Sequence, residues 1–195
     1  MMDKIEQIDR ELLLFINGMN SPFFDSLMWQ ISHQLIWVPL YLFFLIYAYR
    51  KLNLKSFIFF IIGVSLCFLF ADRLSVMAFK EVFLRYRPSH NLEIKDLIHT
   101  YINSNGDEYR GGMYGFVSSH AANFSALSTF LFLNFKRNSK WWNLIWFWTL
   151  LILYSRMYLG VHYPLDIIGG TVLGISIGFV VYKVLTTFRL IKSDK

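Results

Sequence analysis

Two long apolar runs of this sequence are joined by Ser155-Arg156-Met157-Tyr158-Leu159-Gly160-Val161-His162-Tyr163-Pro164-Leu165-Asp166. This segment places an arginine, a histidine and a carboxylate in one short turn at a predicted membrane boundary. Ionisable side chains at such a depth are costly unless they are paired and used, so they are functional candidates. We therefore interpret the upstream chain as the part that supplies partners to this turn and holds it at the bilayer edge.

The composition predicts an integral-membrane protein. Of the 195 residues, 55% are hydrophobic, and the mean hydropathy is +0.42. A typical soluble domain is about 45–50% apolar, and the excess here lies in runs near the roughly 20 residues that a spanning helix needs. The single cysteine, Cys67, excludes a disulfide framework and a Cys-rich metal site. The chain has a net charge of +6. Membrane proteins with basic cytoplasmic loops have such a charge, so no nucleic-acid partner is expected.

We expect an all-α bundle of about five transmembrane helices that forms a single domain over residues 1–195. The predicted spans cover residues 24–49, 56–80, 119–135, 141–158 and 164–186. Residues 1–20 carry too many charges for a cleavable signal peptide. Asp72 and Arg73 fall inside the second span, so we expect them to face the bundle interior, as an ion-paired lock or as support for the site.

Two further segments complete the predicted organisation. Residues 3–17 form an amphipathic helix, which lies in the membrane interface or packs on the protein. Residues 81–117 form a long polar loop, and loops of this length are usually functional or disordered. His33 is interpreted as a structural or interfacial histidine. Gly170, Gly174 and Gly178 recur every four residues, a spacing that lets a second helix approach closely.

The distribution of charge predicts the orientation. With five spans, one side of the membrane holds a single acidic residue, Asp194, and ten basic ones: Arg50, Lys51, Lys55, Lys136, Arg137, Lys140, Lys183, Arg189, Lys192 and Lys195. The remaining nine basic and twelve acidic residues lie elsewhere. Because cytoplasmic loops carry the Lys/Arg excess, the turn at 155–166 is expected to face the outside.

Three polar clusters meet on that outer side, each at the end of a predicted span. Lys80, Arg87 and Arg156 are cations that can bind phosphate oxygens. Ser118 offers a hydroxyl, and the backbone N–H groups of Ser119 and His120 lie at a helix N-terminus, which favours anions. His162 has Asp166 four residues later, so a carboxylate can hold Nδ1 and leave Nε2 free to attack phosphorus. The chemistry predicted for these residue types is phosphoryl transfer.

Other interpretations of the same residues stay open at this point. Asp166 and His120 could serve only their helix starts, and Lys80 and Arg87 could be headgroup anchors. His120, His162 and Asp166 could also bind zinc. The three surrounding cations disfavour that site because they repel a dication, so no metal is expected.

Taken together, the clusters resemble the three-part signature of the type-2 phosphatidic acid phosphatase superfamily. The signature consists of Lys80 with Arg87-Pro88, then Ser118-Ser119-His120, and then Arg156 with His162 and Asp166. The family usually has Pro-Ser-Gly-His in the second part, where this chain has Val117-Ser118-Ser119-His120. Serine in place of glycine keeps the backbone donor and adds a side chain near the phosphate.

The resemblance implies a membrane phosphatase without a metal or other cofactor. It implies that His162 attacks phosphorus to form a phosphohistidine, that Asp166 orients His162, and that His120 protonates the leaving oxygen and then activates water. Lys80, Arg87, Ser118, Ser119 and Arg156 would stabilise the phosphoryl oxygens.

The expected substrate is a lipid phosphate or pyrophosphate presented at the outer face of a bacterial inner membrane. Undecaprenyl pyrophosphate is the first choice, and lipid A 4′- or 1-phosphate and phosphatidylglycerophosphate are the alternatives. A non-enzymatic transporter component is a different class, disfavoured because spans three and five have few polar residues toward the cytoplasmic side. A vanadium haloperoxidase is disfavoured because those relatives are soluble. The sequence does not indicate an oligomeric state.

Overall fold

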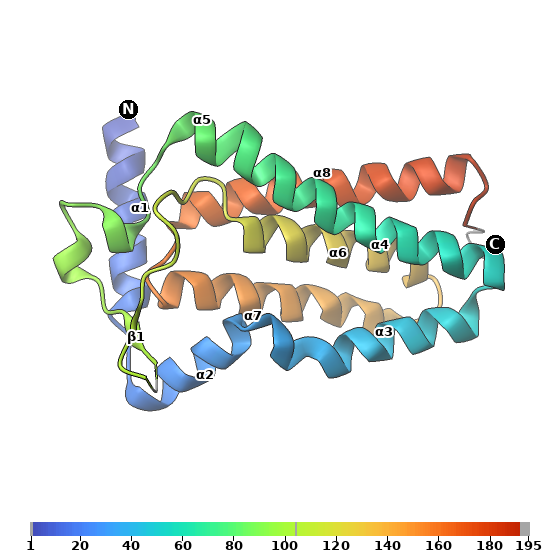
Figure 1. The fold of residues 1–195 in the computed structure, drawn as a ribbon, viewed down its shortest axis with the longest axis horizontal. Helices are drawn as coiled ribbons and strands as arrows, with labels where there is room; N and C mark the ends of the chain where they lie inside the picture. The colour runs from blue at the N-terminus through green and yellow to red at the C-terminus, as the bar shows by residue number, and fades with distance from the viewer. Residues whose placement is uncertain (1, 104, 192–195) are drawn as a thin grey trace.

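The computed structural model describes residues 2–103 and 105–191 as a long helical bundle with one helix across its end (Figure 1). The lengthwise helices are α2 (Pro22–Ser32), α3 (Val38–Lys51), α4 (Leu54–Leu74), α6 (Ser119–Phe135), α7 (Leu144–Tyr158) and α8 (Pro164–Thr187). Helix α1 (Met2–Asn17) crosses the end where α6 and α8 begin. The all-α fold predicted from the hydrophobic runs is confirmed.

Residues 81–117 connect α4 to α6 and lie at this same end of the bundle (Figure 1). They contain α5 (Glu81–Phe83), 3-10 turns at Pro88–His90 and Lys95–Leu97, and a small antiparallel ribbon of β1 (Tyr101–Ile102) and β2 (Glu108–Tyr109). Aromatic contacts fix the ribbon, since Trp29 of α2 stacks on Tyr101 at 4.8 Å. The loop is thus tied to α2. Ser104, within this loop, lies outside the described residues.

The centre of the bundle is the close pair α6 and α8. A side chain at Gly170, Gly174 or Gly178 would run into the backbone of α6, at Ser118, Ala122 and Ala126 respectively. Each glycine therefore removes the atom that would separate the helices. The packing role predicted from the four-residue spacing is confirmed. It also places the starts of α6 and α8 together, where the backbone N–H of Ser118 donates to the carbonyl of Asp166 at 3.0 Å.

Two continuous helices are long and apolar enough to cross a membrane, Leu54–Phe83 and Pro164–Thr187. A third candidate is the pair Pro22–Ser32 and Gln34–Lys51, which is bent by 68°. Helices α6 and α7, of 17 and 15 residues, lie alongside them in the same bundle (Figure 1).

The expectation of one unbroken helix over 24–49 is therefore wrong. Helix α2 ends at Ser32, His33 is extended, and a 3-10 turn at Gln34–Trp37 leads into α3. Pro39 lies in the first turn of α3. Its ring and missing N–H are incompatible with a continuous helix through residues 35–39, so a new helix starts there. The indole of Trp37 donates to the carbonyl of Ile31 at 2.8 Å across the break.

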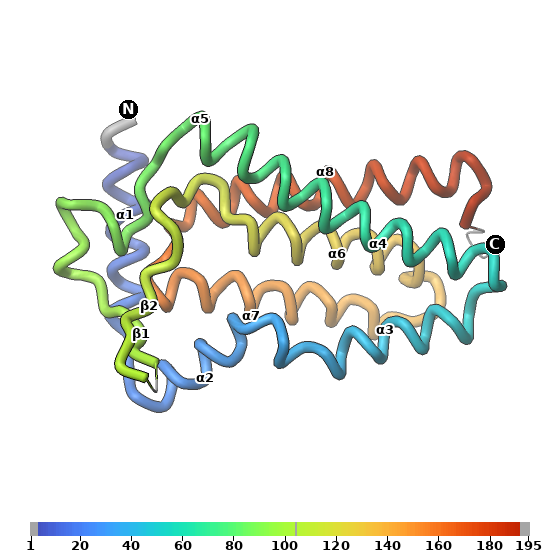
Figure 2. The backbone as a smooth tube through the Cα atoms, viewed as in Figure 1, coloured from blue at the N-terminus to red at the C-terminus, as the bar shows by residue number. Residues whose placement is uncertain are grey.

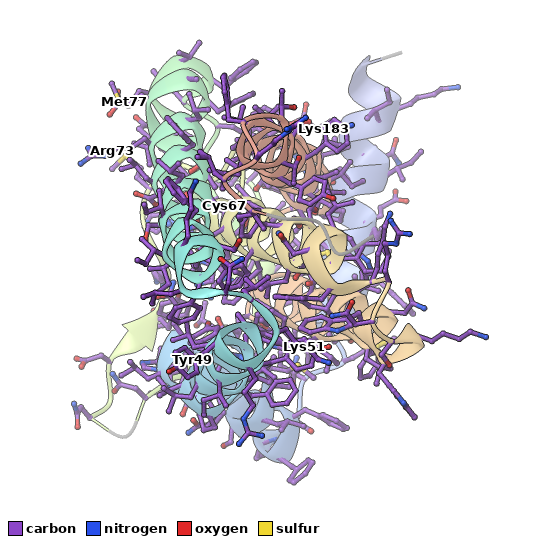
Figure 3. The ribbon with its side chains drawn as sticks, turned by 90° about the vertical axis from the view of Figure 1, so that its right-hand side faces the viewer. Tyr49, Lys51, Cys67, Arg73, Met77 and Lys183 are labelled. Atoms are coloured by element: carbon purple, nitrogen blue, oxygen red, sulfur yellow. The ribbon has the colours of Figure 1, made fainter. Side chains whose placement is uncertain are left out.

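Of the two predictions made for the second span, one is confirmed and one is wrong. Cys67 is fully buried, as expected for a packed thiol. Asp72 and Arg73 do not face the interior: both are exposed on the outer side of α4, and Arg73 points away from the bundle in Figure 3. Charges near a helix end reach water without being buried. Beyond them the span continues through a π-helical turn, Ser75–Lys80, into α5.

Helix α1 packs on the protein along one face, as one of the two predictions for it required. Asp9, Leu13 and Asn17 are buried against the protein. The opposite face exposes Ile5, Ile8, Leu12 and Phe15, which is an apolar stripe suited to the membrane interface.

The two ends of the bundle differ in charge. The α3–α4 and α6–α7 connections and the end of α8 lie together, far from α1 (Figure 2). Exposed there are Arg50, Lys51, Lys55, Lys136, Arg137, Lys140, Lys183 and Arg189. Lys192, Asp194 and Lys195, which entered the charge count, lie outside the described residues.

Candidate active site

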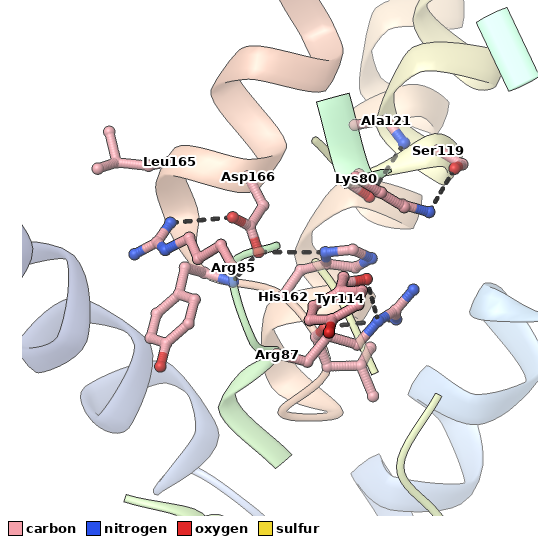
Figure 4. Close-up of polar contacts among 12 residues, drawn as sticks. Lys80, Arg85, Arg87, Tyr114, Ser119, Ala121, His162, Leu165 and Asp166 are labelled. Atoms are coloured by element: carbon pink, nitrogen blue, oxygen red, sulfur yellow. Dashed lines mark hydrogen bonds and ion pairs between the residues drawn. The ribbon is translucent and has the colours of Figure 1, made fainter. Parts of the chain in front are cut away.

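The predicted site residues meet where α6 and α8 begin and α7 ends. His162 precedes α8, and its Nδ1 lies 3.3 Å from Oδ2 of Asp166 in the first turn (Figure 4). Pro164 starts the helix, because its fixed φ suits the first turn and its absent N–H is not needed there. Histidine and carboxylate are both almost completely buried. The Nδ1–carboxylate contact expected from their spacing is therefore present.

The carboxylate of Asp166 is held from several sides. Its Oδ2 accepts from the backbone N–H of Tyr163 at 3.0 Å, and its Oδ1 accepts from Arg85 at 2.9 Å. Gly115 covers it so closely that an added Cβ would lie 2.7 Å from Oδ2. Asp166 thus has one orientation, in which it faces His162 and Arg85.

Arg85 and Asp9 were not foreseen from the sequence. Arg85 bridges two carboxylates, with Asp9 at 2.7 Å and Asp166 at 2.9 Å. The other oxygen of Asp9 accepts from the backbone N–H of Leu165 at 2.8 Å. Burial by itself lowers the pKa of Arg85, but Asp166 and Asp9 raise it above its ordinary value. Helix α1 is therefore tied by a charged bridge to Asp166, the carboxylate that contacts His162.

Three cations surround the histidine, and none of them forms an ion pair within the described residues. Lys80 donates to Oγ of Ser119 at 2.6 Å, and Arg87 donates to the carbonyl of Tyr114 at 3.1 Å. Arg156 donates to the hydroxyl groups of Ser32 and Tyr109. Buried cations held by neutral groups keep their charge available for an anion. The arrangement leaves positive charge without a carboxylate partner beside His162, which favours an anion.

The start of α6 contributes the second predicted cluster. Ser118 caps the helix, since its Oγ accepts from the N–H of Ala121 at 3.4 Å. The hydroxyl of Ser119, which stands where the family has glycine, lies between Lys80 and Ser75, 2.8 Å from the latter. The extra side chain thus faces Lys80. N–H groups in the first turn of a helix lack partners within the helix and favour an anion.

His120 lies beside Arg156. Both side chains line a hollow of about 310 Å³ together with residues of α2 and the following turn, among them His33. His33, interpreted from the sequence as structural or interfacial, therefore borders the site. Ser32 and Tyr109, the partners of Arg156, gave no signal in the sequence, because only the fold brings them near residue 156.

The cations also determine the protonation state of the site. Burial, followed by the charges of Arg87, Arg156 and Lys80, lowers the pKa of His162 well below its ordinary value. Burial and Arg156 lower the pKa of Arg87 to about 10. The lowered pKa of His162 favours the neutral imidazole, which has a free lone pair. Among the described residues, no three His, Cys, Asp or Glu side chains are placed to hold a metal ion.

Comparison with known proteins identifies the class. Residues 56–190 match the model of the PAP2 superfamily, and this segment contains the residues described above from Lys80 to Asp166. The chain belongs to this family. Together with its apolar helices and the relatives below, the match makes it a membrane lipid phosphatase, as the sequence motifs predicted.

The chain is similar to three phosphatases over most of its length. The chain is 37% identical to a lipid A 4′-phosphatase of Porphyromonas gingivalis, over 94% of this chain and 75% of the relative. It is 35% identical to a lipid A 4′-phosphatase of Bacteroides thetaiotaomicron, over 93% of this chain and 79% of the relative. An undecaprenyl-diphosphatase of Sulfolobus acidocaldarius is 30% identical, over 84% and 70%.

A solved structure shows the same fold. The transmembrane PAP2-type phosphatidylglycerolphosphate phosphatase from Bacillus subtilis superimposes with a TM-score of 0.71 at 18% identity, over 95% of this chain and 88% of that one. At this identity the likeness concerns the fold alone.

Proposed function

We propose that this protein removes the 4′-phosphate of lipid A, or of a closely related phosphorylated sugar lipid. The observation that carries the chemistry is the buried His162–Asp166 pair, with three cations around it that have no carboxylate partner among the described residues. The similarity to two lipid A 4′-phosphatases over more than nine tenths of the chain supports the substrate. These relatives favour lipid A over undecaprenyl pyrophosphate, the first expectation from the sequence.

The proposed reaction begins with Nε2 of neutral His162 attacking the phosphorus atom in line. A P–N bond forms while the bond to the 4′-oxygen of the sugar breaks. Asp166 accepts the Nδ1–H hydrogen bond and stabilises the positive charge that develops on the ring. Lys80, Arg87 and Arg156, with Ser118 and the N–H of Ser119, compensate the charge on the phosphoryl oxygens.

His120 handles the proton in this proposal. It passes a proton to the leaving sugar oxygen and then, as a base, takes one from a water molecule. That water attacks the phosphohistidine, so the P–N bond breaks, inorganic phosphate leaves and neutral His162 is restored. The proton can enter with a singly protonated phosphate monoester, so the cycle balances without a metal or another cofactor.

The proposed location is a bacterial inner membrane with the site on the outer side. The exposed cations at the far end of the bundle support this orientation. Lipid A is then presented to the site from the outer leaflet.

A direct test is phosphate release by the purified protein in detergent. We expect release from bis-phosphorylated lipid A, with the loss assigned to the 4′ position by mass spectrometry, and expect release to continue in EDTA. His162→Ala should lower turnover by about 10³-fold or more, since the nucleophile is lost. His90→Ala, on the neighbouring loop and outside the site, is the matched control.

Other outcomes point elsewhere. Release from undecaprenyl pyrophosphate but not from lipid A would support the second candidate, which the relative from Sulfolobus acidocaldarius favours. Loss of activity in EDTA that zinc restores would overturn the metal-free mechanism.

A further inference from the structure

The hollow beside His120 has the properties of a subsite for the leaving group. It measures about 310 Å³, and it is lined by His120 and Arg156. His162, Lys80 and Arg87 are not among its described lining residues. The proton donor therefore faces the hollow, whereas the nucleophile lies outside it. A phosphoryl group held between the cations would direct its leaving oxygen toward His120, and hence into this space.

The lining of the hollow is polar and aromatic. His33 and Gln34, both exposed at the helix break, form part of the wall, with Trp29 and Tyr109 beside them. The imidazole and the amide can each donate and accept hydrogen bonds. Neither side chain forms a hydrogen bond in the portion of the chain that the structure describes.

The aromatic side chains are firmly placed. Trp29 stacks on Tyr101 and meets Tyr109 edge to face, each with ring centroids 4.8 Å apart. Tyr109 in turn accepts from Arg156 at 2.7 Å. A fixed aromatic surface next to free hydrogen-bonding groups matches a sugar ring, which has apolar C–H faces and a rim of hydroxyl groups.

The size of the hollow fits one ring. Small-molecule sites measure roughly 300–1,000 Å³, so this hollow lies at the lower limit of that range. An apolar groove of about 290 Å³ shares Gln34 with it and continues past Tyr41 of α3 and Phe60 and Val64 of α4. A ligand with a polar ring in the hollow would therefore keep its hydrocarbon part next to an apolar surface.

We infer that this hollow is a sugar-binding subsite, in which Trp29, His33, Gln34 and Tyr109 receive the phosphorylated sugar ring that becomes the leaving group. The inference rests on the proposed function, because it assigns His120 to the leaving oxygen. It goes further, since it makes the break between α2 and α3 the feature that selects a glycosyl phosphate over a phosphate attached to a simple alkyl or acyl chain.

The test compares two substrates in each variant. For bis-phosphorylated lipid A and for phosphatidic acid, which lacks a sugar, kcat/KM is measured with the full-length protein in detergent. In Gln34→Leu the kcat/KM for lipid A divided by that for phosphatidic acid should fall by about three- to tenfold, which is the effect of one lost hydrogen bond. In the double variant His33→Leu/Gln34→Leu it should fall by at least about tenfold.

A matched control comes from the same helix. Gln30→Leu removes an exposed amide of α2 that does not line the hollow, so its ratio should equal that of the wild type. Thermal midpoints and phosphatidic acid turnover identify any variant that is merely misfolded. In that case Gln34→Glu, which retains a polar side chain of similar size, replaces Gln34→Leu in the comparison.

The results separate the two proposals. If the wild type releases no phosphate from lipid A, the proposed function fails. If it does so, but the Gln34 and His33 variants lose both substrates equally or match Gln30→Leu, the sugar subsite is overturned. A selective loss of lipid A turnover supports it.

Discussion

At the scale of single residues, the site uses its arginines in two different ways. Arg87 and Arg156 have neutral partners and keep their charge for a substrate anion. Arg85 is paired with Asp9 and Asp166, so we propose that it positions Asp166. Sequence alone does not distinguish Arg85 from Arg87, which are two residues apart, because the difference depends on which carboxylate the fold places nearby.

Replacing Arg85 should lower the rate of the chemical step more than it lowers the affinity for the substrate. In Arg85→Gln the carboxylate of Asp166 loses its fixed partner, and a small misplacement near the reacting atoms costs up to about 100-fold in rate. We expect kcat to fall by about 10- to 100-fold with KM changed by less than about threefold. Arg85→Lys should recover part of kcat, because it retains the charge.

The matched control is Arg10→Gln. Arg10 also joins α1 to the 81–117 loop, through an ion pair of 2.6 Å with Glu93, but it does not contact Asp166. Its kcat should stay near that of the wild type. Equal losses in both variants would mean that Arg85 only anchors the helix.

At the scale of secondary-structure elements, α6 and α8 act as a unit. Their glycine-mediated approach brings the cap at Ser118 to the carbonyl of Asp166 and so joins two of the three clusters. The break between α2 and α3 places His33 and Gln34 in the lining of the hollow beside His120. The geometry of the candidate site therefore depends on backbone packing as well as on its side chains.

Gly174→Ala should destabilise the protein although alanine favours helix formation. The new Cβ would collide with the backbone of Ala122 and lie 2.9 Å from the N of Ala126, and backbone cannot move aside cheaply. Overpacking of this kind costs roughly 1–3 kcal/mol, which should lower the thermal midpoint in detergent. Gly112→Ala is the control, because an added Cβ there meets nothing within 4 Å. An unchanged midpoint for Gly174→Ala would contradict the close packing.

At the scale of the whole molecule, the bundle has a basic end and an opposite end that holds the candidate site (Figure 2). Helix α1 lies at the end that holds the candidate site, where its Asp9 pairs with Arg85. Its apolar stripe of Ile5, Ile8, Leu12 and Phe15 faces outward. A helix lying in the outer interface would hold the site at the surface where the lipid headgroup is found.

The orientation can be tested with single cysteines in a Cys67→Ala background. Leu97→Cys lies on the exposed 81–117 loop, and Asn138→Cys on the exposed α6–α7 connection. In intact spheroplasts we expect a membrane-impermeant maleimide to label position 97 but not 138, and to label both after lysis. The reverse pattern would place the site in the cytoplasm.

The sequence by itself determined the helices, the family, and the three clusters with the order of their residues. Hydrophobic runs set helix type and length locally, and the spacing of His162 and Asp166 within one turn sets their contact. The prediction for Asp72 and Arg73 was wrong because exposure depends on which side of a helix meets its neighbours. The break at His33 was missed although Pro39, which explains it, is a local feature of the sequence.

Only the tertiary structure decided the second set of partners. Asp9 reaches Arg85 across 76 positions of the chain, and Ser32 reaches Arg156 across 124. Contacts between residues so far apart leave no local pattern, since any polar side chain on those helices would look alike in the sequence. They form because the close approach of α6 and α8, with α1 and α2 packed around the same end, leaves these groups as the available hydrogen-bonding partners of buried charges that must be satisfied.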